Sequence, residues 1–268
     1  MTGKRDYSDY ILNCLPSSNR EGDWSLAAAS DAGIFEPKAM AASEKDLREP
    51  WWAIPDQGRT GSCVGWGIAD GVLRWHFVKA NRLAKNEPLS VRYLWMAAKE
   101  TDEFISRPTT FIEQDGTSLK AALDVARKYG VVKSSILPFE NRDGSPELYD
   151  AGDANSFYAI ASQMRISSYF NLGQDLGNWR SWISTNGPIL TRLNVDSTWD
   201  KATENEGRLQ AYDSAHTRGG HCVALVGYTK DFFIVRNSWG KQWGKSGFAF
   251  AYDAYASNAF TEAYGISL

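Results

Sequence analysis

In the first two thirds of the chain, apolar residues recur at intervals of three and four, the spacing of one face of a helix. This pattern predicts helices over residues 62–79, 90–99, 117–129 and 175–185, with a shorter one near residues 24–29. The first helix has three glycines in its interior: Gly65, Gly67 and Gly71. Because glycine lowers helix propensity, we expect another element to pack closely against that helix.

In the last third, the apolar residues come in short runs bounded by glycine and polar residues, which is typical of strands. We predict strands over residues 189–195, 222–228, 232–235 and 248–252. A chain with helices first and strands later favours an α+β fold with two lobes or layers.

Composition narrows the class of protein. The chain has 268 residues, of which 43% are hydrophobic, and its net charge is −3. This length indicates one large domain or two small ones, with enough apolar material for a sizeable core. The slight acidity argues against nucleic-acid binding, which usually needs a basic surface. No apolar run approaches the roughly 18–20 residues of a membrane span, so we expect no membrane partner.

Three cysteines need an explanation: Cys14, Cys63 and Cys222. An odd and low count excludes a disulfide framework. Three free thiols are expected in a reducing compartment, although one disulfide with one free thiol also fits. The N-terminus has no apolar signal segment, so we expect a cytoplasmic protein or one exported without a recognisable signal peptide.

Cys63 lies where extended chain passes into the predicted helix over residues 62–79. The helix dipole and unpaired N–H groups of a first turn favour an anion, and they lower the pKa of a thiol. This position therefore suits a nucleophile. A buried core cysteine, the commonest fate of a free thiol, explains the residue equally well.

A thiol nucleophile needs a partner that takes its proton, and imidazole is suited to this. His76 lies about three and a half turns further along the same helix, too far to reach the thiol, and His216 lies in a polar loop. His221 follows two glycines at the start of a strand, so pairing favours it. Asn237, which ends another strand, could then orient the imidazole, although a turn asparagine fits as well.

These segments together resemble the papain-like cysteine peptidases. Gln57 stands six residues before Cys63, Gly-Gly precedes His221, and Asn-Ser-Trp-Gly begins at Asn237. The order Gln, Cys, His, Asn matches the family, and the resemblance runs from about Ser43 to the end of the chain. The sequence has Thr60 where the family often has a disulfide cysteine, which indicates a prokaryotic-style, bacterial member lacking the usual disulfides.

The resemblance implies a catalytic role for four residues. Cys63 would attack the peptide carbonyl and form an acyl-thioenzyme, with His221 as base and acid. Asn237 would orient His221, and Gln57 would donate to the oxyanion. The implied substrate-binding residues are Asp115, Gly116, Thr117, Gly220, Cys222 and Trp239. Cys14 has no implied role beyond packing.

The resemblance also implies a two-lobe fold with the cleft between the lobes. A helical left lobe would span about 58–155, and an antiparallel, β-barrel-like right lobe would span about 156–268 plus 43–57. Residues 1–42 form an N-terminal extension, either a short inhibitory prosegment, which would make the protein a zymogen, or a structural strap.

The implied activity is hydrolysis of peptide bonds in a peptide or protein substrate, by a monomer. Two other functions stay open: an acyl transferase or amidase with the same residues, and a catalytically silent relative that only binds. We expect no cofactor and no metal site, because no cluster of residues has the spacing of metal ligands.

Overall fold

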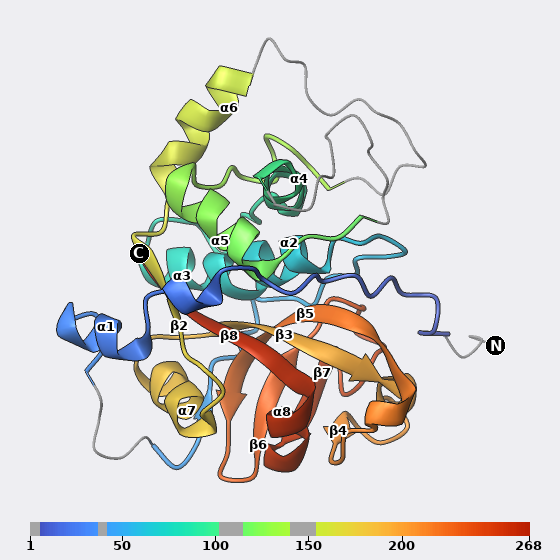
Figure 1. Cartoon of the computed structure of the whole chain (residues 1–268). Coiled ribbons are helices and arrows are strands. Elements are labelled where there is room, and N and C mark those ends of the chain that lie inside the picture. The colour runs from blue at the N-terminus through green and yellow to red at the C-terminus, as the bar shows by residue number, and fades with distance from the viewer. Residues whose placement is uncertain (1–5, 37–41, 102–114, 140–153) are drawn as a thin grey trace.

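The structure is a computed structural model that describes residues 6–36, 42–101, 115–139 and 154–268. The fold is of the α+β class, with a group of helices packed on one large sheet (Figure 1). One apolar core fills the helical half, and a second lies beneath the sheet. Within the described ranges, no helix is both long enough and apolar enough to cross a membrane.

The helices of the described residues are α1 (Leu26–Asp31), α2 (Cys63–Ile68), α3 (Arg74–Lys79), α4 (Val91–Thr101), α5 (Leu119–Lys128), α6 (Ala154–Ala161), α7 (Leu176–Thr185) and α8 (Asp253–Ala259). A π-helical turn, η2 (Ala69–Leu73), joins α2 to α3. The shorter 3₁₀ turns are η1 (Arg20–Gly22), η3 (Ser162–Met164), η4 (Ser197–Lys201) and η5 (Ser214–His216).

The described strands are β1 (Lys45–Asp46), β2 (Ser168–Asn171), β3 (Ile189–Asp196), β4 (Arg208–Leu209), β5 (Thr217–Tyr228), β6 (Phe232–Arg236), β7 (Phe248–Tyr252) and β8 (Phe260–Ser267). They form one sheet in the order β2-β8-β3-β5-β6-β7-β4, and β1 also pairs with β5. All pairs are antiparallel except β4 with β7. The sheet stays open rather than closing into a barrel, because β2 and β4 end the path without pairing with each other.

The predicted helix over residues 62–79 is confirmed, and so is the close approach to its glycines. A side-chain carbon on Gly67 would lie 2.4 Å from Sγ of Cys222, and one on Gly71 would lie 3.1 Å from Cβ of Ala224. Strand β5 therefore packs directly on this helix, because only hydrogen occupies the space between them. The contact sets the position of Cys63, at the start of α2, relative to β5.

Other predicted elements are also confirmed, but the boundaries and the end of the chain differ. Strand β5 begins at Thr217, five residues before the predicted 222–228, because it extends through the polar Gly-Gly segment along β3. Helix α8 and strand β8 were not predicted. Helix α6 crosses the expected lobe boundary at 155–156, and Tyr158 on it packs on Tyr129.

The N-terminal extension has two parts in the described residues. Residues 6–19 run across the molecule along the boundary between the helices and the sheet, as the dark blue trace in Figure 1 shows. The part from η1 to Phe35 packs outside the sheet, where Phe35 stacks on Trp182 and Tyr264 donates to Asp23. We call residues 6–19 the cleft segment from here on.

Candidate active site

Cys63 is the first residue of α2 and is fully buried. The pKa of its thiol lies well below the ordinary value, chiefly because the neighbouring Cys14 thiol stabilises the charged sulfur. Burial opposes this shift, while the nearby imidazole of His221 adds to it. The surroundings of Cys63 therefore favour the thiolate, the nucleophilic form of the residue.

His221 on β5 and Asn237, just after β6, meet beside Cys63. Nε2 of His221 lies 2.8 Å from Oδ1 of Asn237, and the same oxygen accepts the backbone N–H of Ser238 at 2.8 Å. The N–H of Ser238 fixes the amide orientation, so Oδ1 faces the imidazole. Because Asn237 occupies Nε2, the other ring nitrogen is left for Cys63.

Two tryptophans enclose the imidazole of His221. The ring centroid of Trp239 lies 5.1 Å from that of His221, and the ring of Trp199 meets it edge-on at 5.6 Å. All three residues are fully buried. The bond between His221 and Asn237 is therefore shielded from water, which strengthens it.

Gln57 is buried beside the start of α2, and its amide group has fixed partners. Its Oε1 accepts from Oγ of Ser238 at 2.7 Å, and its Nε2 donates to the carbonyl of Thr60 at 3.0 Å. An amide nitrogen has two hydrogens, and Thr60 uses one of them. Ser238 therefore orients both Gln57 and Asn237, a role that was not predicted although Ser238 lies inside the Asn-Ser-Trp-Gly motif.

The cleft segment bonds to both halves of the molecule. The N–H of Cys14 donates to the carbonyl of Gly220 at 2.9 Å, and the N–H of Leu15 donates to the carbonyl of Thr117 at 3.0 Å. At Gly116 a side-chain carbon would lie 1.8 Å from the carbonyl oxygen of Asn13. The segment thus contacts three of the expected substrate-binding residues through their main chain.

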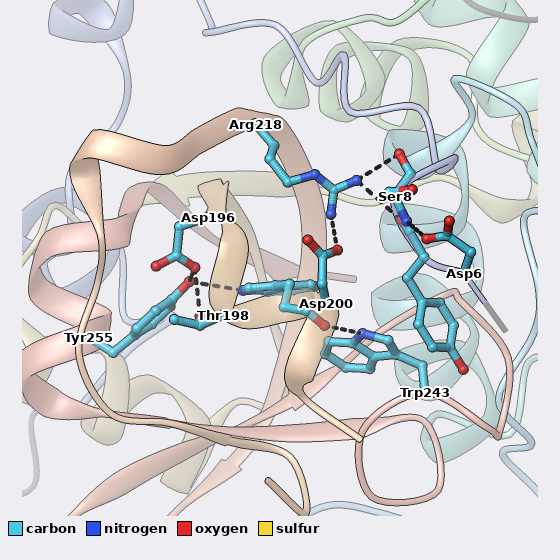
Figure 2. Close-up of polar contacts among 10 residues, drawn as sticks. Asp6, Ser8, Asp196, Thr198, Asp200, Arg218, Trp243 and Tyr255 are labelled. Atoms are coloured by element: carbon cyan, nitrogen blue, oxygen red, sulfur yellow. Dashed lines mark hydrogen bonds and ion pairs between the residues drawn. The ribbon is translucent and has the colours of Figure 1, made fainter. Parts of the chain in front are cut away.

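Aromatic and charged side chains hold the first part of the cleft segment. Tyr10 packs on Trp239 with ring centroids 4.8 Å apart, and Tyr7 stacks on the same indole at 6.1 Å. Figure 2 shows Arg218 donating to the carbonyl of Ser8, at 2.9 Å, while it pairs with Asp200. These contacts cover Trp239, another expected substrate-binding residue.

The other two expected substrate-binding residues are Asp115 and Cys222. The carbonyl of Asp115 accepts the indole N–H of Trp95 at 3.0 Å. Cys222 is buried with its sulfur against Gly67, so it contacts α2. Of the other histidines, His76 is buried, which lowers its pKa to about 4, and His216 forms an exposed pair with Asp213.

Cys14 was expected only to pack, but the structure places its thiol near Cys63 in the same buried core, where its sulfur lies 3.9 Å from the carbonyl oxygen of Leu15. Its carbonyl accepts from Nε of Arg192 at 3.0 Å. The chain around Cys14 has no helical or strand periodicity, so no sequence signal pointed to this contact. All three cysteines are buried and none forms a disulfide. Among the described residues, no group of His, Cys, Asp or Glu is arranged to hold a metal ion.

Comparison with known proteins gives consistent matches. The family model described as "Papain family cysteine protease" matches residues 41–263. Cathepsin B-like CP2 of Giardia intestinalis is 31% identical over 234 residues, which cover 82% of this chain and 72% of that protein. Cathepsin J of Mus musculus is 27% identical over 216 residues, or 76% of this chain, and this chain spans only 58% of the cathepsin J length.

Solved structures share the fold. Xylellain, a cysteine protease from Xylella fastidiosa, superposes with a TM-score of 0.78 at 20% identity, covering 100% of this chain and 99% of that one. Digestive procathepsin L 3 from the Tenebrio molitor larval midgut has a TM-score of 0.63 at 17% identity, covering 98% of this chain and 78% of that one.

Proposed function

The chain belongs to the papain family of cysteine proteases, and on that premise we propose that it hydrolyses peptide bonds through an acyl-thioenzyme on Cys63. The arrangement that supports this most is the buried series from Cys63 to His221 to Asn237, with a 2.8 Å contact between the last two. A nucleophile, a proton carrier and a residue that orients the carrier are the parts that acyl transfer from an amide requires.

Each step of the proposed hydrolysis has a residue that performs it. The Cys63 thiolate attacks the carbonyl carbon, and the negative charge that develops on oxygen is stabilised by the remaining amide hydrogen of Gln57. His221 protonates the departing amine, which leaves an acyl group on sulfur. His221 then takes a proton from water, and the hydroxide releases the acid and regenerates the thiolate.

The substrate would bind as an added strand. Gly116, Thr117 and Gly220 offer main-chain groups on the two sides of Cys63, and the cleft segment already uses two of their carbonyls. Main-chain bonds of this kind hold a peptide without regard to its sequence. Trp239 would contact the part of the substrate beyond the cut bond.

We propose further that the cleft segment is an inhibitory prosegment and that the protein is a zymogen. The segment uses hydrogen bonds that a substrate needs, and it covers both Trp239 and Cys63. The chain then divides into an extension, residues 1–42, and a catalytic domain, residues 43–268. Within the extension, the part after residue 19 serves as a strap on the sheet.

Comparing peptide hydrolysis by the full chain with that by a protein lacking residues 1–19 tests both proposals. The shortened protein keeps the strap, so we expect it to fold, and its thermal unfolding checks this. We expect rapid hydrolysis by the shortened protein, little by the full chain, and none when the shortened protein also has Cys63→Ala. Equal activity with and without residues 1–19 would contradict inhibition. Products in which an added amine replaces water would indicate a transferase instead.

A further inference from the structure

Cys14 and Cys63 are brought together by main-chain contacts at a fixed position in the cleft. The N–H of Cys14 bonds to Gly220 at 2.9 Å, its carbonyl accepts from Arg192 at 3.0 Å, and the next N–H bonds to Thr117 at 3.0 Å. Cys14 is 2% exposed and Cys63 is 0% exposed. Both cysteines belong to the same buried core and act on each other's charge, so the two thiols are neighbours across the boundary between the cleft segment and the enzyme.

The two sulfurs differ in protonation. Burial raises the pKa of Cys14 well above its ordinary value, and the neighbouring Cys63 adds to this. The pKa of Cys63 is lowered by the neighbouring Cys14 and by His221. Cys63 is therefore the more acidic and more nucleophilic of the two, and Cys14 is a neutral thiol beside it. A low-pKa thiolate beside a second cysteine is the arrangement found in reversible redox sites.

We propose that Cys14 and Cys63 form a peroxide-sensitive modification site that closes into a disulfide, tying the cleft segment covalently over the nucleophile. This inference rests on the proposed function, in which Cys63 is the nucleophile and the segment inhibits. The oxidised protein is a locked zymogen, and a small dithiol unlocks it.

The chemistry balances with hydrogen peroxide as the oxidant. The Cys63 thiolate attacks one peroxide oxygen, the O–O bond breaks, and the departing hydroxide takes a proton to become water. The resulting sulfenic acid is attacked by the sulfur of Cys14, the S–O bond breaks, and the second hydroxide leaves with the Cys14 proton as water. Two thiols and one peroxide thus give one disulfide and two waters, with sulfur oxidised and oxygen reduced.

Cys222 is close to Cys63 but is not suited to be the partner. Its sulfur packs on Gly67, 2.4 Å from the place a side-chain carbon would take. Burial raises the pKa of Cys222 well above its ordinary value, and the nearby Cys63 charge raises it further. Without Cys14, the sulfenic acid on Cys63 has no thiol suited to attack it, so excess peroxide carries it on to sulfinic acid, which thiols do not reduce.

The test treats the full-length protein with equimolar hydrogen peroxide and measures its intact mass and its non-reduced peptide map. We expect the loss of two hydrogens and a peptide pair joined through Cys14 and Cys63, both reversed by dithiothreitol. Cys222→Ser should form the same cross-link. Cys14→Ser should instead gain two oxygens on Cys63 in excess peroxide, and dithiothreitol should not remove them.

Several results would overturn the inference: no cross-link in the wild-type protein, a cross-link that includes Cys222, or the same irreversible oxidation in the wild-type protein and Cys14→Ser. Circular dichroism checks that the variants are folded. The mass measurement requires no peptidase activity. If the cross-link forms but the protein lacking residues 1–19 hydrolyses no peptide, the proposed function fails and the redox site stands. If that protein hydrolyses peptides but the full chain forms no cross-link, the redox site fails and the proposed function stands.

Discussion

A proline at position 15 removes one of the two main-chain hydrogen bonds that the cleft segment donates across the active site. In the closed state the N–H of Leu15 donates to the carbonyl of Thr117 at 3.0 Å, and Thr117 is 0% exposed. Proline has no N–H, so this carbonyl would be buried without its donor, at a cost of about 1–3 kcal/mol. When the segment leaves, water reaches the carbonyl, so the open state bears no such cost.

Leu15→Pro should therefore raise the open population, and with it the rate at which the full chain hydrolyses peptides, by a factor of about 5–150. The rise stops at the rate of the protein lacking residues 1–19. Initial rates on a fluorogenic peptide measure the effect under reducing conditions. Leu15→Val is the matched control, because it keeps the N–H and removes one methylene, worth at most about 0.8 kcal/mol or fourfold. The reasoning is refuted if Leu15→Pro stays as inactive as the wild-type chain while the shortened protein is active, or if Leu15→Val activates equally.

Three other predictions concern the thiolate, its partner and the fold. Asn237→Ala in the protein lacking residues 1–19 should lower kcat/KM by a factor of about 5–150, because it removes a buried hydrogen bond worth about 1–3 kcal/mol; an unchanged kcat/KM would contradict the orienting role. Cys14→Ala in the full chain should raise the pKa of Cys63, because the Cys14 thiol is the largest cause that lowers it. The thiolate fraction near neutral pH should then fall, which ultraviolet absorbance of the thiolate would measure. An unchanged titration of Cys63 would contradict the effect of Cys14. Asp70→Asn should lower the free energy of unfolding in urea by about 3–5 kcal/mol, because Arg236, which is 3% exposed, loses its ion-pair partner. A decrease of less than about 1 kcal/mol would contradict this.

The parts of the site that come from local sequence patterns could be predicted. Cys63 follows a Gly-rich stretch at the start of an apolar helix, and His221 was selected because the other two histidines lay in unsuitable places. The structure places these two residues close to each other, with Asn237 hydrogen-bonded to the imidazole of His221. Short-range spacing was enough there, because helix and strand starts fix the direction of such side chains.

The parts that depend on contacts between distant segments could not be predicted. Residues 6–19 have no helical or strand periodicity, and their path is set by bonds to Gly220 and Thr117, which lie far along the chain. Cys14 therefore looked like a packing residue, and the extension looked like one unit instead of a cleft segment and a strap. Strand β8 was not predicted, because the strands it pairs with, β2 and β3, are remote in sequence.

Acid-quench mass spectrometry during turnover tests the central claim most directly. The protein lacking residues 1–19 is mixed with a peptide ester, stopped in acid within the first turnovers, and mapped by peptide. Hydrolysis through an acyl-thioenzyme predicts one acyl group per chain, located on Cys63, which disappears as free acid accumulates. An acyl group on Cys222, or product formation without any acyl group on the protein, would contradict the account.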